Sequence, residues 1–239
     1  MNRPRIAVLD ASHNERDTKR NFRRELDAEL VEFDVTSGEL PETFDLDGAV
    51  VTGSRSSVYW DEPWIGSLKE WIAEAVDHGL PFLGVCYGHQ LLADVLGGTV
   101  KGMGSYEIGY NEIRRTGESP LFEGIDERFL AFTTHSDAVT ALPPDAEALA
   151  ENEYSNHGFR KDRVFGVQFH PEYDLETAES LTRRKPITEE RRRRVLEGIT
   201  EENYDAACQA KLVFENFVEY VNDLRPESAA ADAESAAAD

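Results

Sequence analysis

The sequence predicts an α/β protein with an open, mostly parallel sheet and helices on both of its faces. In the first hundred residues, short and continuously apolar segments alternate with stretches of helical periodicity. Apolar strands of this kind are typical of parallel sheets that are covered on both sides. The length of 239 residues and the hydrophobic content of 40% suit one such domain with a full core.

The strands and helices of this half follow one another in a regular order. Strands are expected at residues 6–9, 30–35, 49–53 and 81–85, where apolar runs end at glycine, proline or turn residues. Helices are expected at about 15–28, 64–76 and 91–96. The second helix has the clearest boundaries, because Pro63 marks its start and Gly79 its stop.

The pattern changes after Gly98. Further strands are expected at 106–115, 129–133 and 163–169, with hairpin-like and extended connections. We expect one domain over residues 1–226, in which about 181–226 form a helical C-terminal extension. Residues 227–239 are acidic, rich in alanine and of low complexity, so a disordered tail is expected there.

The charge is strongly acidic, with 47 acidic and 25 basic residues and a net charge of −22. Such a surface repels phosphate backbones, which argues against nucleic acid as a partner. A lure for a cationic partner is one interpretation. Because the acids are spread along the chain, solubility in a salty, halophile-like cytoplasm is the more economical one. No apolar run is long enough for a bilayer or a signal peptide, so a cytoplasmic protein without membrane contact is expected.

One of the two cysteines stands in a motif that suits catalysis. Cys86 lies in the sequence Gly-Val-Cys-Tyr-Gly, at the turn from a strand into a helix. This is the layout of a nucleophile elbow, in which the helix N-terminus favours a thiolate and the N–H of Tyr87 faces a developing oxyanion. Alone, the motif fits a small buried cysteine equally well. Cys208 falls in the apolar stripe of a helix, where core packing is expected.

A base and its orienting acid are found at the end of another strand. His170 follows an apolar strand in the sequence Phe-His-Pro-Glu, and Glu172 can face the same side and accept the second imidazole N–H. Taken alone, the tripeptide fits a loop that opens a helix. Together with the cysteine elbow it predicts a catalytic triad. His89 and His135 are expected to be structural, and His13, His78 and His157 to be solvated.

Gly-Val-Cys-Tyr-Gly-His-Gln at 84–90 and Phe-His-Pro-Glu at 169–172 resemble the class I glutamine amidotransferases. The resemblance covers about residues 5–175 and implies the flavodoxin-like fold of that family. It implies that Cys86 attacks the side-chain amide of glutamine, releases ammonia and leaves a γ-glutamyl thioester for water to hydrolyse. His170 and Glu172 would complete the triad. No cofactor or metal ligand is implied.

The resemblance also implies residues around the triad. Gly53, in the loop after an early strand, would supply the first oxyanion N–H and Tyr87 the second. Gln90 would contact the substrate glutamine. Ser136 and Asp137, in Thr-Thr-His-Ser-Asp, would face its α-amino and α-carboxyl groups. The loop at 52–58 reads Thr-Gly-Ser-Arg-Ser-Ser-Val rather than the double-glycine-proline of GMP synthetase glutaminases, and is closer to stand-alone GMP synthase-like amidotransferases.

Several functions share this chemistry. The leading hypothesis is a glutaminase that passes ammonia to a separate synthetase, since no ATP-binding motif is present in the sequence. A γ-glutamyl hydrolase or peptidase would use the same triad on another γ-glutamyl compound. A non-enzymatic scaffold and a redox-sensing Cys86 are less economical. The charged segment 188–204, with arginines at 191–194, is expected to be a solvated helix face, and a partner-docking helix is the alternative.

Overall fold

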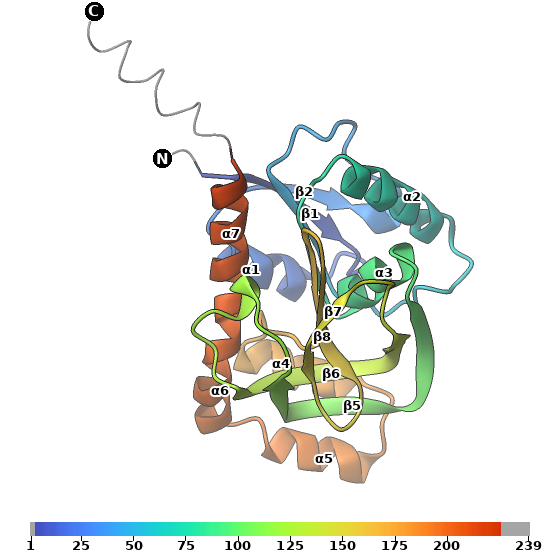
Figure 1. The fold of residues 1–239 in the computed structure, drawn as a ribbon. Coiled ribbons are helices and arrows are strands. Elements are labelled where there is room, and N and C mark those ends of the chain that lie inside the picture. The colour runs from blue at the N-terminus through green and yellow to red at the C-terminus, as the bar shows by residue number, and fades with distance from the viewer. Residues whose placement is uncertain (1–2, 226–239) are drawn as a thin grey trace, which may run out of the picture.

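A nine-stranded mixed sheet forms the centre of the protein, and helices cover both of its faces (Figure 1). The computed structural model describes residues 3–225, so the expected tail at 227–239 lies outside the described residues. The strand order is β2-β1-β3-β4-β9-β8-β7-β5-β6. The strands are β1 (Arg5–Asp10), β2 (Glu29–Asp34), β3 (Gly48–Val51), β4 (Phe82–Val85), β5 (Thr99–Arg115), β6 (Arg128–Ala141), β7 (Glu147–Glu151), β8 (Asn156–Lys161) and β9 (Val164–Val167).

The first five strands of this order run parallel, and alternate side chains enter two separate cores. In β1, Ile6 and Val8 join one hydrophobic cluster, whereas Ala7 and Leu9 join the other. The first cluster lies under α1 (Arg16–Glu25) and α7 (Leu212–Leu224), and the second lies under α2 (Pro63–Asp77) and α3 (Tyr87–Val95). Burial on both faces explains why these strands are continuously apolar, as the sequence predicted.

The remaining strands pair antiparallel and form the second half of the sheet. β9 pairs with β4 in parallel and with β8 in antiparallel orientation, so it lies at the boundary between the two halves. β5 and β6 form a long hairpin whose register shifts between Gly102 and Glu107. β7 and β8 were not predicted from the sequence, because they are short and carry asparagine, glycine and charged residues.

The helices after the sheet are α4 (Leu175–Arg184), α5 (Glu189–Glu197), α6 (Glu201–Ala207) and α7. Short 3₁₀ turns lie at Val35–Ser37 and Pro120–Phe122, between strands, and at Cys208–Lys211, before α7. Helical structure in the C-terminal part was predicted, but α4 begins earlier than the expected extension. Cys208 is half-buried rather than a core residue. No helix in residues 3–225 is long and apolar enough to span a bilayer.

The arginine-rich helix α5 is only partly a solvated face. None of its residues is buried, and Arg194 pairs with Glu190 at a spacing of four, as expected for an exposed helix. Arg191, however, donates a hydrogen bond to the carbonyl of Tyr106 in β5, and Val195 packs near Gly109. The helix therefore covers the antiparallel half of the sheet, below β5 in Figure 1.

Candidate active site

Three neighbouring parallel strands bring the predicted site residues together at their carboxyl ends. Val85 of β4 is the register partner of Val167 in β9, and Val51 of β3 is the partner of Gly84. Cys86 directly follows β4, His170 follows β9 by three residues, and Gly53 follows β3 by two. The carboxyl ends of neighbouring parallel strands therefore collect these residues, as is usual for sites in open α/β sheets.

Cys86 occupies a strained turn that allows almost no space around it. Its φ of 54° lies in the left-handed region, which non-glycine residues seldom adopt. A methyl group added to Gly84 would lie 2.4 Å from the carbonyl of Gly88, and one added to Gly88 would lie 2.3 Å from the oxygen of Val51. Only glycine lets the first turn of α3 lie this close to β3 and β4, which is the close approach expected of a nucleophile elbow.

His170 and Glu172 form a buried pair beside the thiol. The Nδ1 atom of His170 lies 2.8 Å from Oε1 of Glu172, and both side chains are almost fully buried. Nε2 of His170 has no hydrogen-bond partner among the described residues, and Cys86 lies on the same side of Gly53 as this ring. Burial lowers the pKa of His170, but the Cys86 thiolate and the Glu172 carboxylate outweigh burial and raise it to about 10. The imidazolium form of His170 is therefore favoured at neutral pH.

Residues outside the two motifs hold this pair in place. Tyr173 stacks on the His170 ring at a centroid distance of 4.2 Å, and the backbone N–H of His170 donates to the carbonyl of Phe132 at 2.8 Å. Arg24 of α1 donates to the carbonyl of Glu172 at 2.6 Å. Sequence analysis missed these contacts, because Phe132 and Arg24 are far away in the chain and no sequence pattern indicates that Tyr173 stacks on His170.

Gly53 lies directly against Cys86 and the imidazole of His170. A methyl group added to it would lie 3.1 Å from Cε1 of His170 and 3.8 Å from Cβ of Cys86. Tyr87 is the first residue of α3, where backbone N–H groups lack partners within the helix. Both residues predicted to supply the oxyanion N–H groups therefore lie next to Cys86.

The segment at the middle of β6 closes the site from the antiparallel half. The carbonyl of Thr134 lies 4.0 Å from the sulfur of Cys86. Asp137 accepts hydrogen bonds from Ser57 at 2.5 Å and from Tyr59 at 3.1 Å. Gln90 donates to the carbonyl of Asp137 at 2.9 Å and to the side chain of Gln168 at 3.0 Å.

The predicted substrate-binding residues Gln90, Ser136 and Asp137 lie together beside Cys86. Asp137 is buried and Ser136 is half-exposed beside it. Both amide hydrogens of Gln90 are used within the protein, so its Oε1 atom remains for a ligand. Sequence analysis missed Ser57 and Tyr59, although both stand in or next to the loop that it singled out at 52–58.

The remaining histidines differ partly from expectation. His135 and His89 are buried, as predicted for structural residues. The expectation that His157 is solvated was wrong, because its exposed fraction is 0% and its ring reaches Glu107 at 3.2 Å. His13 is half-buried and bonded to Ser56, whereas His78 is exposed as predicted.

The fold and the site together define an α/β protein with a thiol at a strand-to-helix elbow and a histidine–glutamate pair beside it. More specifically, the chain belongs to the class I glutamine amidotransferase family, whose model, "Glutamine amidotransferase class-I", matches residues 8–187. This agrees with the resemblance found in the two motifs.

Individual relatives agree with the family. The chain is 40% identical over 126 residues to a glutamine-hydrolysing GMP synthase from Thermomicrobium roseum, covering 52% of this chain and 23% of that protein. It is 32% identical over 187 residues to one from Azoarcus sp., covering 72% and 34%. The matched part is thus only about a quarter to a third of these relatives.

The matches to solved structures cover nearly all of this chain and nearly all of the matched chain. A glutamine amidotransferase from Thermotoga maritima matches with a TM-score of 0.75 at 25% identity, covering 92% of this chain and 100% of that one. A glutamine amidotransferase from Methylobacillus flagellatus has a TM-score of 0.71 at 20% identity and covers 92% and 95%, a likeness in fold. The predicted fold class is therefore confirmed.

Proposed function

We propose that this chain hydrolyses the side-chain amide of glutamine through a γ-glutamyl thioester on Cys86 and supplies the ammonia to a separate synthetase. The observation that carries the proposal is the convergence of Cys86, His170 and Glu172 at one sheet edge, with His170 between the thiol and a buried carboxylate. Membership of the amidotransferase family supports glutamine as the amide.

In the first half-reaction, the Cys86 thiolate attacks the amide carbon of glutamine. The N–H groups of Gly53 and Tyr87 stabilise the oxyanion of the tetrahedral intermediate, an interaction that strengthens in the transition state. The imidazolium of His170 donates its proton to the leaving nitrogen, and the C–N bond breaks to release ammonia. Cys86 then carries a γ-glutamyl thioester and His170 is neutral.

In the second half-reaction, neutral His170 removes a proton from water, and the hydroxide adds to the thioester carbon. Collapse of the second oxyanion breaks the C–S bond, releases glutamate and restores the thiolate–imidazolium pair. Glu172 fixes the tautomer of His170 throughout and stabilises its charged form. The same histidine therefore acts as the acid in the first half-reaction and as the base in the second.

In this proposal, residues 136 and 137 of β6 and the side chains that contact them recognise the substrate. We propose that the carboxylate of Asp137 accepts hydrogen bonds from the α-amino group of glutamine. Ser57 and Tyr59 donate to this carboxylate and hold it in position. Ser136 and the Oε1 atom of Gln90 would supply further polar contacts. The GMP synthase relatives favour a synthetase as the ammonia acceptor. We also propose a cytoplasmic location, with the acidic surface suited to high salt.

A labelling experiment tests the proposed nucleophile. A glutamine-analogue electrophile should modify Cys86 at one equivalent per chain, and Cys86→Ala should abolish both labelling and turnover while leaving the melting temperature nearly unchanged. Cys208→Ala is the matched control and should keep both. Preferential modification of Cys208 would refute the site assignment.

A substrate comparison tests the function that the nucleophile serves. Purified protein should release ammonia from free glutamine, and turnover should rise when the cognate synthetase is added. Activity confined to γ-glutamyl peptides would instead establish the γ-glutamyl hydrolase alternative. A fully folded protein that is inert towards both substrates, with and without the synthetase, would support a non-enzymatic scaffold.

A further inference from the structure

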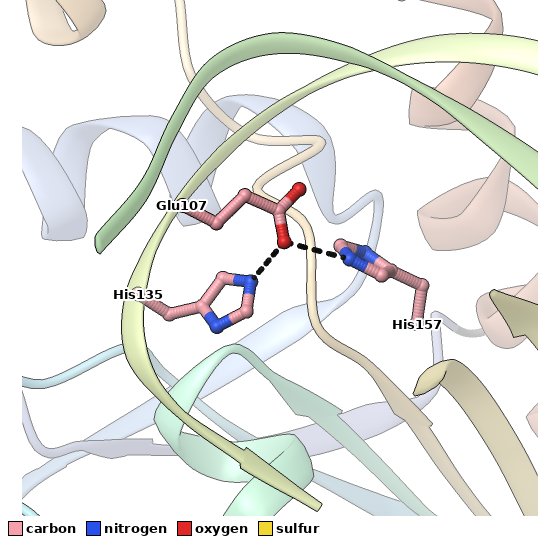
Figure 2. A group of neighbouring side chains, drawn as sticks. All are labelled: Glu107, His135 and His157. Carbon is pink, nitrogen blue, oxygen red and sulfur yellow. Dashed lines mark hydrogen bonds and ion pairs between the residues drawn. The ribbon is translucent and has the colours of Figure 1, made fainter. Parts of the chain in front are cut away.

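A second cluster of chemically capable side chains lies buried in the antiparallel half of the sheet. Glu107 of β5 and His135 of β6 are direct cross-strand partners, and His157 reaches them from β8. Figure 2 shows the Glu107 carboxylate between the two imidazoles, with one of its oxygens facing both. The exposed fractions are 1%, 4% and 0%, so the cluster is shielded from bulk solvent.

The hydrogen-bond pattern around His135 requires either a proton or a metal ion between its second ring nitrogen and Glu107. Its Nδ1 atom lies 2.9 Å from the carbonyl oxygen of Asp137, which can only accept, so Nδ1 carries a proton. Its Nε2 atom in a neutral ring then presents a lone pair to Oε2 of Glu107 at 2.9 Å. Two electron-pair donors at this distance repel each other unless a proton or a metal ion lies between them.

The same carboxylate oxygen also faces the second imidazole. Oε2 of Glu107 lies 3.2 Å from Nε2 of His157, and one ligand atom from each of the three residues lies within 4.8 Å of the others. Zinc bonds of about 2.0–2.2 Å at tetrahedral angles place two ligand atoms about 3.3–3.5 Å apart. Each imidazole nitrogen would therefore need to move away from the Glu107 oxygen by only a few tenths of an ångström to hold an ion, and the two imidazoles already offer ligand atoms within 4.8 Å of each other.

We propose that Glu107, His135 and His157 form a buried site for a divalent transition-metal ion, with zinc the best match. Two imidazoles and one carboxylate are a ligand set that zinc and other first-row ions prefer. This inference departs from the sequence expectation of no metal ligand. It does not rest on the proposed glutaminase activity.

The outer contacts of the cluster match those of metal ligands. His135 is oriented by the backbone carbonyl of Asp137 through its other ring nitrogen, which leaves Nε2 free to coordinate. The second oxygen of Glu107 accepts a hydrogen bond from the side-chain amide of Asn152 at 2.7 Å. Partners of this kind fix the tautomer and orientation of ligands in metal sites.

The position of the cluster gives the ion a structural role beside the active site. The carbonyl of Asp137 accepts from both His135 and Gln90, each at 2.9 Å. An ion held by residues of β5, β6 and β8 would fix this segment without touching the thiol of Cys86. Loss of the ion should therefore lower thermal stability and loosen the segment that carries Asp137.

The test uses the full chain without an affinity tag, purified in the absence of chelators. Elemental analysis should find about one zinc per chain after dialysis, and a strong chelator should remove it and lower the melting temperature. Replacement by cobalt(II) should produce the visible absorption of a four-coordinate ion. The cobalt titration is read on the unaltered protein, so it does not depend on how a variant folds.

Variants then assign the ligands. Glu107→Gln keeps the shape but removes the charge, and should lose the metal and the cobalt spectrum. Asn152→Ala should weaken zinc affinity by about 10- to 100-fold, as loss of an outer contact does. His78→Asn, an exposed histidine, is the control and should retain one equivalent. Metal-free protein that gains no visible absorption with cobalt and melts identically with and without chelator would overturn the proposal and leave a proton-bridged cluster.

Discussion

The glycines of the cysteine elbow allow a quantitative test of how the nucleophile is placed. In Gly88→Ala the new methyl group would lie 2.3 Å from the carbonyl oxygen of Val51, whereas real contacts of this type essentially never fall below 3.0 Å. Because the obstacle is backbone, either α3 or β3 must move by at least about 0.7 Å. Overpacking of this kind costs about 3 kcal/mol or more when the neighbours cannot yield.

This cost has two measurable consequences. A loss of about 3 kcal/mol should lower the melting temperature by about 6–12 °C in a chain of this size, as followed by circular dichroism. A shift of Cys86 relative to His170 should also reduce the rate of labelling by a glutamine-analogue electrophile by about 100-fold, since reacting groups tolerate little misplacement. Gly84→Ala, with a contact of 2.4 Å to Gly88, should behave in the same way.

Gly66 provides the matched control for this experiment. It lies on the exposed side of α2, and a methyl group added there would meet nothing within 4 Å. Alanine is favoured over glycine in a helix by about 0.5–1 kcal/mol, so Gly66→Ala should raise the melting temperature slightly and leave labelling unchanged. If Gly88→Ala melts within about 1 °C of the unaltered protein, a shift too small for the overpacking cost, the close approach of α3 to β3 is not what positions Cys86.

Further predictions concern the residues around the thiol and the charge of the chain. Glu172→Gln should lower kcat by about 10²–10⁴-fold in steady-state assays, because the imidazolium of His170 loses its charged partner; a change below about threefold would contradict this. Asp137→Asn should raise KM for glutamine by about 10- to 100-fold with kcat changed far less, since one charged hydrogen bond is worth about 1.5–3 kcal/mol; an unchanged KM would remove Asp137 from substrate binding. Burial, then His157, lowers the pKa of His89 from 6.5 to about 3, so this ring binds a proton in the unfolded chain but not in the folded one across that window. The free energy of unfolding should therefore fall by about 1.4 kcal/mol per pH unit as pH drops below the unfolded pKa. In His89→Gln, the free energy of unfolding measured with denaturant should depend less steeply on pH than in the unaltered protein. With a net charge of −22, raising KCl from about 0.1 to 2 M should raise the melting temperature by screening self-repulsion; a constant or falling value would oppose an adaptation to salt.

The parallel half of the sheet and the proximity of Cys86, His170 and Glu172 could be predicted from sequence because their determinants are local. Cys86 and its flanking glycines are close together in the chain, and His170 and Glu172 are two residues apart. The apolar runs around them indicate burial on both faces directly. Only one long-range assumption, that β4 and β9 are neighbours, is then needed to bring the nucleophile and the base together.

Much of the antiparallel half could not be predicted from sequence, because the contacts that determine it join residues far apart in the chain. β7 and β8 are short and have only one large apolar residue each, Leu149 and Phe159. His157 is buried because β8 lies against β9 and within reach of Glu107, which is 50 residues away in the chain. Nothing around His157 in the sequence distinguishes it from a solvated histidine. Ser57 and Tyr59 likewise could not be identified from sequence, because their hydrogen-bond acceptor, Asp137, lies about 80 residues further along the chain.

In the proposed function, this division of the sheet separates the chemistry from the recognition of the substrate. Cys86 and His170 are placed by β4 and β9, whose parallel register is fixed by the two apolar cores. Asp137 and Thr134 are placed by β6, at the far edge of the antiparallel half, where the carbonyl of Thr134 contacts the thiol and the carbonyl of Asp137 accepts a hydrogen bond from Gln90. Changes within the hairpin can therefore alter which γ-glutamyl compound is bound while leaving the triad intact. The expected signature is a change in KM, with the rate of Cys86 labelling by a small, non-specific alkylating agent preserved.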